Sequence, residues 1–172
     1  MKEEHLSPKE ARFSDLPRSL RDQFIDTMDI LSVAYKDAEL ASWIDEALSI
    51  VGHNPRFWDA GIEYASASKE VSKSLPFSLF KTWAKCGTML AHESPNLATA
   101  YFRASPIVIP ILRQKHISSW ANLGKAMYKG SWKSSILASK FFDVSPMLVR
   151  DIPFWDLETF SSIIEQLSQK SY

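Results

Sequence analysis

Residues 83–106 read WAKCGTMLAHESPNLATAYFRASP, and residues 120–146 read WANLGKAMYKGSWKSSILASKFFDVSP. Each stretch begins with Trp-Ala and places a glycine four positions after the tryptophan. Each closes with two adjacent aromatic residues, two further residues and Ser-Pro. Self-similarity with a period of about 37 to 40 residues indicates an internal structural repeat of the size found in helical arrays.

A weaker copy precedes these two, and a truncated one follows them. Trp43 lies one period before Trp83, and Tyr64-Ala-Ser-Ala-Ser lies one period before Tyr101-Phe-Arg-Ala-Ser. Trp155 would begin a fourth copy that the end of the chain cuts short. We therefore expect units at approximately 37–76, 77–116 and 117–154, followed by a terminal capping helix at 155–171.

Hydrophobic periodicity predicts helices throughout. Leu20, Phe24, Met28 and Leu31 recur at helical spacing, and no segment of comparable length alternates as a strand does. We expect an all-α fold, a right-handed α-solenoid of the HEAT or armadillo kind with about three units. Residues 1–14 are predicted to be a flexible N-terminus, and 15–172 a single domain. The predicted helix starts are Asp15, Asp37, Asn54-Pro55, Leu75-Pro76, Ser94-Pro95, Ser105-Pro106 and Ser145-Pro146, the last two opening short helices.

The recurring glycines need a physical reason, because glycine inside a helix costs about 1 kcal/mol relative to alanine. Gly87 and Gly124 both fall in the middle of predicted helices. We expect a neighbouring helix to approach closely at both positions. The aromatic pairs are expected to fill the space between helices, and most of the tryptophans and phenylalanines to lie in the core.

The W-x-x-x-G, aromatic-pair and Ser-Pro pattern resembles the helical repeat region in the N-terminal part of NorD- and CoxE-like proteins. Those proteins carry a C-terminal von Willebrand factor A domain and act with MoxR-type AAA+ ATPases. The resemblance spans roughly residues 38–160 and implies a helical repeat that contacts such an ATPase or its client. The D-x-S-x-S metal loop of the von Willebrand domain is absent, because the nearest run, Asp143-Val-Ser-Pro-Met147, lacks its final serine. The resemblance therefore carries over no metal site.

Catalytic and membrane signatures are not found. Cys86 is the only cysteine, so no intramolecular disulfide forms, and His53, His92 and His116 offer no i, i+4 zinc pair. No glycine-rich phosphate loop occurs, and we expect no enzymatic activity, cofactor or metal. The N-terminus lacks an apolar signal core, and the aliphatic run 107–112 is too short to span a bilayer. We expect a cytoplasmic protein that does not enter membranes.

Charge is unevenly distributed although the net charge is zero. Residues 1–72 are strongly acidic, whereas residues 73–140 contain many basic side chains and Glu93 as their single acid. In a stacked array such side chains can line one face and bind a protein partner with an acidic surface; a nucleic-acid backbone is the alternative. Docking against the chain's own acidic block, or scattered solubilising lysines, would explain the same pattern. The candidate partner-binding residues are Lys81, Lys85, Arg103, Arg113, Lys115, Lys125, Lys129, Lys133 and Lys140.

Overall fold

The computed structural model describes residues 6–112, 116–151 and 166, and this part of the chain is all-α, without strands. The predicted capping helix at 155–171 lies outside the described residues, apart from residue 166. The described helices are α1 (Arg18–Leu31), α2 (Asp37–Val51), α3 (Trp58–Ser74), α4 (Phe77–Glu93), α5 (Pro95–Ile111), α6 (Ile117–Met127) and α7 (Trp132–Asp151). Two short 3-10 turns, η1 (Glu10–Phe13) and η2 (Pro55–Phe57), precede α1 and α3.

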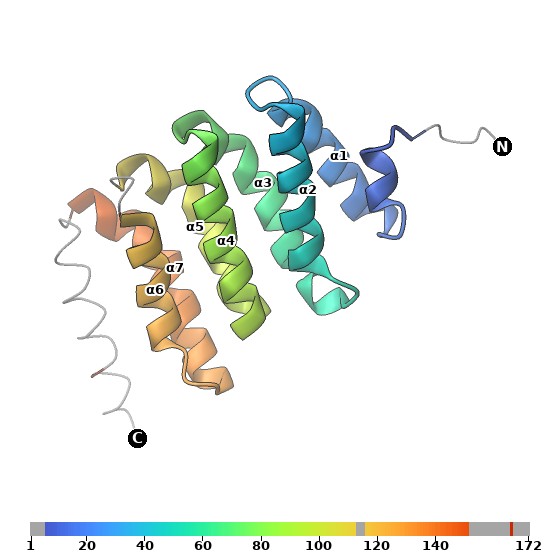
Figure 1. Ribbon diagram of the computed structural model, residues 1–172. Coiled ribbons are helices and arrows are strands. Elements are labelled where there is room, and N and C mark those ends of the chain that lie inside the picture. The colour runs from blue at the N-terminus through green and yellow to red at the C-terminus, as the bar shows by residue number, and fades with distance from the viewer. Residues whose placement is uncertain (1–5, 113–115, 152–165, 167–172) are drawn as a thin grey trace.

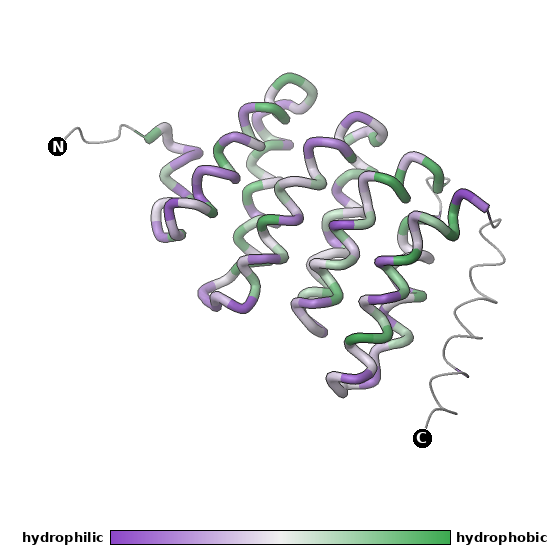
Figure 2. Tube along the Cα trace, turned by 180° about the vertical axis from the view of Figure 1, so that it is seen from behind, coloured by the Kyte–Doolittle hydropathy of each residue, from purple (hydrophilic) through white to green (hydrophobic). Residues whose placement is uncertain are grey.

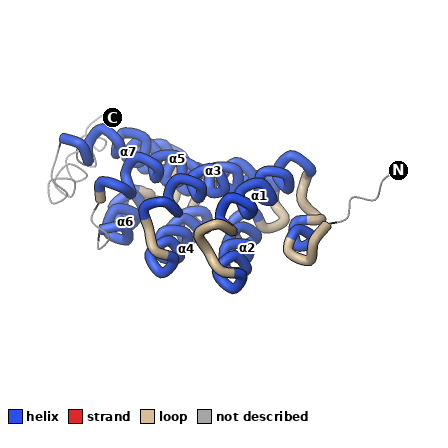
Figure 3. Tube along the Cα trace, turned by 90° about the horizontal axis from the view of Figure 1, so that it is seen from above, coloured by secondary structure: helices blue, strands red, loops and turns tan. Residues whose placement is uncertain are grey.

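The helices lie in two layers (Figures 1 and 3). Helices α1, α3, α5 and α7 pack side by side in one layer, and α2, α4 and α6 form the other. Short connections make consecutive helices antiparallel, so the helices of one layer run in the same direction. Each helix turns one apolar stripe towards the other layer, which appears as alternating hydrophobic and hydrophilic segments along the trace in Figure 2.

A continuous column of aromatic rings fills the space between the layers. Successive ring centroids in this column lie 4.9 to 6.4 Å apart. At this spacing aromatic pairs contribute about 0.5–1.5 kcal/mol beyond the burial of their surface. The members, in order, are Phe13, Phe24, Trp43, Tyr64, Trp83, Tyr101, Trp120 and Phe142, all at most 1% exposed.

The same hydrogen-bonded contact recurs three times in the described residues. The indole nitrogens of Trp43, Trp83 and Trp120 donate to the hydroxyls of Ser68, Ser105 and Ser145 at 3.0, 2.8 and 3.0 Å. Each serine hydroxyl donates in turn to the carbonyl four residues before it, at 2.6 Å in every case. We call each such arrangement a Trp–Ser clasp. It joins α2 to α3, α4 to α5 and α6 to α7.

The prediction that Ser105-Pro106 and Ser145-Pro146 open short helices is wrong. Pro106 and Pro110 lie inside α5, and Pro146 lies inside α7. A proline removes one backbone hydrogen-bond donor from a helix, so local sequence patterns predict that the helix ends there. In this fold both serines belong to buried clasps, and packing on either side of the proline keeps the helix continuous.

The predicted close approach at the helical glycines is confirmed. A Cβ atom on Gly87 would lie 2.0 Å from Cζ of Phe102, and one on Gly124 would lie 2.1 Å from Cζ of Phe142. The approaching group is an aromatic ring of the paired helix. Glycine is needed at these positions because a methyl group would occupy the volume of the ring.

Part of the predicted flexible N-terminus packs against the domain. Phe13 is fully buried beside Phe24, and the side chains of Lys9 and Arg12 form ion pairs with Asp37 and Asp45 of α2. The helix starts also differ from the predictions: Pro17 occupies the position before α1, two residues after Asp15, and Asp37 is itself the first residue of α2. At the next predicted start, the Asn54 side chain accepts a hydrogen bond from the Arg56 amide, and this caps η2.

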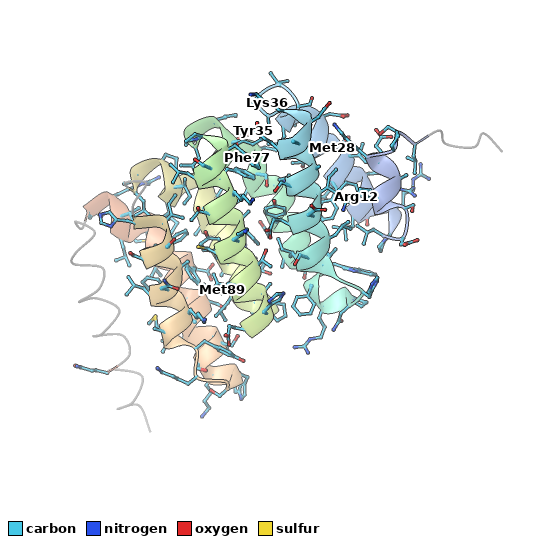
Figure 4. The ribbon with its side chains drawn as sticks, in the orientation of Figure 1. Arg12, Met28, Tyr35, Lys36, Phe77 and Met89 are labelled. Carbon is cyan, nitrogen blue, oxygen red and sulfur yellow. The ribbon has the colours of Figure 1, made fainter. Side chains whose placement is uncertain are left out.

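Tyr35 fixes the end of the α1–α2 connection against the third and fourth helices. Its ring packs edge-on against Phe77 and Phe80, with centroids 5.2 and 5.3 Å apart (Figure 4). Its hydroxyl donates to the carbonyl of Leu75 at 3.3 Å, between α3 and α4. The tyrosine thus joins the α1–α2 connection to the α3–α4 connection and to the first turn of α4.

Candidate interaction faces

The two layers expose two different surfaces. We call the solvent side of α2, α4 and α6 the even face, and the solvent side of α1, α3, α5 and α7 the odd face. Because consecutive helices alternate between layers, residues close in sequence can reach opposite faces. This alternation decides where the predicted binding residues lie.

The structure places the predicted basic residues on both faces. Lys81, Lys85 and Lys125 lie on α4 and α6, whereas Arg103 and Lys140 lie on α5 and α7. Lys129 lies in the α6–α7 connection, Lys133 lies in the first turn of α7, and Arg113 and Lys115 lie outside the described residues. The seven described residues therefore do not form one stripe.

The even face carries two exposed cations that have no carboxylate partner in the described part of the chain. Lys81 and Lys85 lie one turn apart on α4. Neither forms an ion pair there, whereas Lys125 lies 3.8 Å from a carboxylate oxygen of Glu93. On the neighbouring α6, Ser118 is within 3.9 Å of the Cys86 sulfur, which places its hydroxyl at the seam between the two helices. The surface around the lysines is thus polar and cationic.

The acidic side chains of the even face are already bound. Lys9 donates a hydrogen bond to Asp37, and this bond together with the positive charge of Lys9 lowers the pKa of the Asp37 carboxyl. Asp45 pairs with Arg12, and Glu46 accepts a hydrogen bond from Thr88 of α4 at 2.7 Å. Asp37 and Asp45 of α2 are therefore paired with cations, whereas Glu39 accepts a hydrogen bond from the Lys36 amide and Glu46 accepts one from a neutral hydroxyl. No carboxylate of α2 forms an ion pair with the two lysines of α4 in the described part of the chain.

Arg103 bridges three helices of the odd face. Its guanidinium lies 3.6 Å from a carboxylate oxygen of Glu63 on α3 and 3.7 Å from one of Asp143 on α7. All three side chains are partly solvated, so each pair contributes little to stability. The arrangement mainly fixes the lateral register of α3, α5 and α7. The two carboxylates also offset the charge of Arg103, so a partner would meet less positive charge there than the sequence suggests.

A groove of about 330 Å³ lies between α5 and α7 on the odd face. The hydroxyl of Ser139 is buried in it without a hydrogen-bond partner among the described residues. Lys140 is exposed beside it. The remaining lining residues are Asn96, Thr99, Ala100, Arg103, Ile136 and Asp143.

Exposed apolar side chains gather near this groove. Ile107 on α5 is 41% exposed and Met147 on α7 is 69% exposed. They stand one helical turn beyond the paired Arg103 and Asp143, so they are neighbours across the two helices. Sequence reasoning missed this patch, because the two residues are 40 positions apart and only the lateral packing of α5 against α7 brings them together.

A second cavity, of about 380 Å³, lies at the other end of the molecule. Leu16, Leu48 and Trp58 form its apolar wall, and Arg12, Asp15 and His53 stand at its exposed rim. Arg12 is already paired with Asp45. We assign no ligand to it.

The candidate reactive residues do not assemble into a site. His53 lies after α2, His92 lies at the end of α4 and His116 lies before α6. Burial raises the pKa of the half-buried Cys86 thiol, which disfavours its reactive thiolate. Among the described residues, no three histidine, cysteine, aspartate or glutamate side chains come together to hold a metal ion. In the same part of the chain no helix is long and apolar enough to cross a membrane.

Comparisons with protein-family models, curated proteins and solved structures find no match for this chain.

Proposed function

We propose that this protein is a non-enzymatic helical repeat scaffold, an α-solenoid of the HEAT or armadillo kind with about three units. Its even face would bind a protein partner that presents an acidic surface. The recurrence of the Trp–Ser clasp supports the repeat, because α2 with α3, α4 with α5 and α6 with α7 are joined by the same buried bond. Stacked units of this kind expose long faces suited to binding other proteins.

The observation that carries the proposal is the pair Lys81 and Lys85. Like charges spaced i, i+4 destabilise a helix by about 0.2–0.5 kcal/mol. Asp37 and Asp45 of α2 pair with Lys9 and Arg12, and among the described residues no carboxylate of α2 forms an ion pair with either lysine. An acidic partner would relieve this repulsion and would be attracted to the face before contact.

The chemistry of the face favours protein over base-specific nucleic-acid recognition. The predicted basic residues placed on it are lysines, which bind as point charges and lack the planar fork of arginine. The resemblance to repeats that act with MoxR-type ATPases makes such an ATPase the first partner to test. Binding to a nucleic-acid backbone is the alternative outcome.

The test compares two lysine pairs of the same i, i+4 spacing; on α3, Lys73 is already paired with Glu70. Lys81→Glu/Lys85→Glu reverses the even-face pair, whereas Lys69→Glu/Lys73→Glu reverses a pair of the same spacing on α3. Partners captured from cell extract at low salt, and a purified MoxR-type ATPase, are measured against both variants. We expect the first variant to lose binding and the second to retain it. Equal retention by both variants would overturn the assignment of the even face.

Fluorescence polarisation with labelled duplex and single-stranded DNA decides the alternative. For a protein-binding face we expect no saturable signal at about 100 mM salt, where a phosphate-binding surface still responds. A saturable, steeply salt-dependent signal that Lys81→Glu/Lys85→Glu abolishes would assign the face to nucleic acid instead.

A further inference from the structure

We propose that two copies of this chain associate through their odd faces. The twofold axis would run parallel to the helices, so that α1 of each copy lies over α5 and α7 of the other. The pairing is independent of the even face and goes beyond the function proposed above. It rests on the opposite charges and matching apolar side chains at the two ends of the odd face.

The N-terminal end of the odd face is acidic and has an apolar margin. Asp26 and Asp29 are exposed on α1, and Ile30 and Val33 beside them are 48% and 90% exposed. These four residues fall on one stripe of α1 and the turn that follows it. A stripe of carboxylates followed by solvated aliphatic side chains is suited to a partner with the opposite charge and its own apolar surface.

The C-terminal end of the odd face has the complementary composition. Lys140 and Arg150 are exposed on α7, and Ile107 and Met147 form the apolar patch between α5 and α7. The carboxylates on the same helix are Asp143, which is paired with Arg103, and Asp151, which is exposed beside Arg150. The groove beside Lys140 also contains the hydroxyl of Ser139, which has no hydrogen-bond partner among the described residues. A carboxylate entering there would meet an ammonium group and a hydroxyl donor.

Symmetry selects one arrangement of the two copies. When two identical faces meet, the twofold axis lies in the plane between them. An axis perpendicular to the helices would place α1 over α1 and bring the carboxylates together. An axis parallel to the helices reverses the order of the layer and places α1 over α7, which forms the acidic–basic contact twice.

The second arrangement also preserves helix direction. Helices α1 and α7 belong to one layer and run the same way, so the C-terminal part of each lies over that of the other. Ile30 and Val33 then face the region of Met147, and Asp26 faces the region of Lys140. A second copy brings to each end the opposite charge and an apolar surface that matches its own.

The experiment is a charge exchange followed by sedimentation of the full chain at about 1 to 200 µM. We expect the wild type to dimerise, with a dissociation constant that rises with salt. Asp26→Lys and Lys140→Glu, each alone, should weaken the dimer by about tenfold or more, because each places like charges together twice. An equimolar mixture of the two variants should associate again, since both contacts then join opposite charges.

Two further variants, Val33→Asp and Met147→Asp, should also lose dimerisation, because each places a charge in an apolar contact. Asp26, Val33, Lys140 and Met147 are all exposed, so far-UV circular dichroism and the unfolding midpoint of the four variants should stay unchanged. Lys81→Glu/Lys85→Glu should leave the dimer intact, which separates this inference from the proposed function. A chain that is monomeric throughout, or a mixture that does not associate, would overturn the proposal. If Met147→Asp lowered the unfolding midpoint, the patch would be covered by the chain itself, and this result would also overturn the proposal.

Discussion

The indole nitrogen of Trp83 donates a hydrogen bond to the hydroxyl of Ser105 at 2.8 Å, from α4 to α5. Neither residue has measurable exposure. The same hydroxyl donates to the carbonyl of Tyr101 at 2.6 Å. One serine thus satisfies a buried donor on the neighbouring helix and a carbonyl on its own, and the bond orients the tryptophan within the aromatic column.

Ser105→Ala should lower the free energy of unfolding by about 1–3 kcal/mol, because the indole N–H would remain buried without an acceptor. Urea denaturation followed by tryptophan fluorescence measures the loss. Ser145→Ala, in the equivalent clasp with Trp120, should behave alike. Ser66→Ala on the exposed side of α3 is the matched control, with an expected change below about 0.5 kcal/mol. An equally small change in Ser105→Ala would mean that the clasp is not a stabilising contact.

Gly87→Ala should destabilise the protein although alanine is the better helix former. The new methyl group would lie 2.0 Å from Phe102, and overpacking of this kind costs about 1–3 kcal/mol, more than the roughly 1 kcal/mol gained in helix propensity at most. Thermal unfolding measures the net effect. A stabilised Gly87→Ala would show that the ring moves aside at little cost.

The first unit suggests how that conflict can be relieved. It has Ala47 and Ala65 at the positions that Gly87 and Phe102 occupy in the second unit. We expect Gly87→Ala/Phe102→Ala to be less destabilised than the sum of its two single variants, because the ring no longer opposes the methyl group. A double-mutant cycle gives the coupling, and strict additivity would contradict the steric account.

Tyr64 and Tyr101 occupy equivalent positions but differ in their hydroxyls. Tyr101 donates to the carbonyl of Trp83 at 2.9 Å, whereas the Tyr64 hydroxyl is buried without a partner in the described part of the chain. Tyr101→Phe should therefore cost about 0.5–1.5 kcal/mol, and Tyr64→Phe should be neutral or stabilising. Chemical denaturation of the two variants checks the contrast. A larger loss in Tyr64→Phe than in Tyr101→Phe would contradict it.

The helical class and the role of the glycines could be read from the sequence, because both follow from local spacing. Trp83 and Gly87 recur with the period of the repeat. Because glycine is unfavourable inside a helix, its recurrence at the same position predicts that a neighbouring group packs closely there. The continuity of α5 through Pro106 could not be read in this way. It depends on burial of Ser105 against a tryptophan 22 residues earlier in the chain, a distance that local rules do not span.

The candidate binding surface was predictable in composition but not in arrangement. Lys85 and Arg103 are close in sequence, yet the alternation of layers sends them to opposite faces. The pairing of Arg103 with Glu63 and Asp143 also depends on the lateral register of three helices. Counting charged residues along the sequence therefore overestimates the net positive charge of the surface around α5. Lys81 and Lys85 of α4 are exposed in the structure, and their role in partner binding stays a prediction.

The buried tyrosines should make the protein sensitive to alkali. Burial, with a smaller contribution from the negative charge of Glu39, raises the pKa of Tyr35 from its ordinary value of 10.0 to about 12. Burial also raises the pKa of Tyr64 and of Tyr101 well above that value. The neutral phenols are thus favoured in the folded state. Their contribution to stability is complete below about pH 10 and is lost as the pH rises from there through the folded-state values.

Absorbance at 295 nm, which reports phenolate, checks this prediction in native and urea-unfolded protein. Near pH 11 we expect less phenolate in the native chain than in the unfolded one, with the missing signal appearing as the protein unfolds at higher pH. Tyr35→Phe should remove part of that difference, because the substituted ring keeps its packing against Phe77 and loses the ionisable group. Identical titration curves for native and unfolded chains would show that these phenols are solvated, and the aromatic column could then not be closed to water.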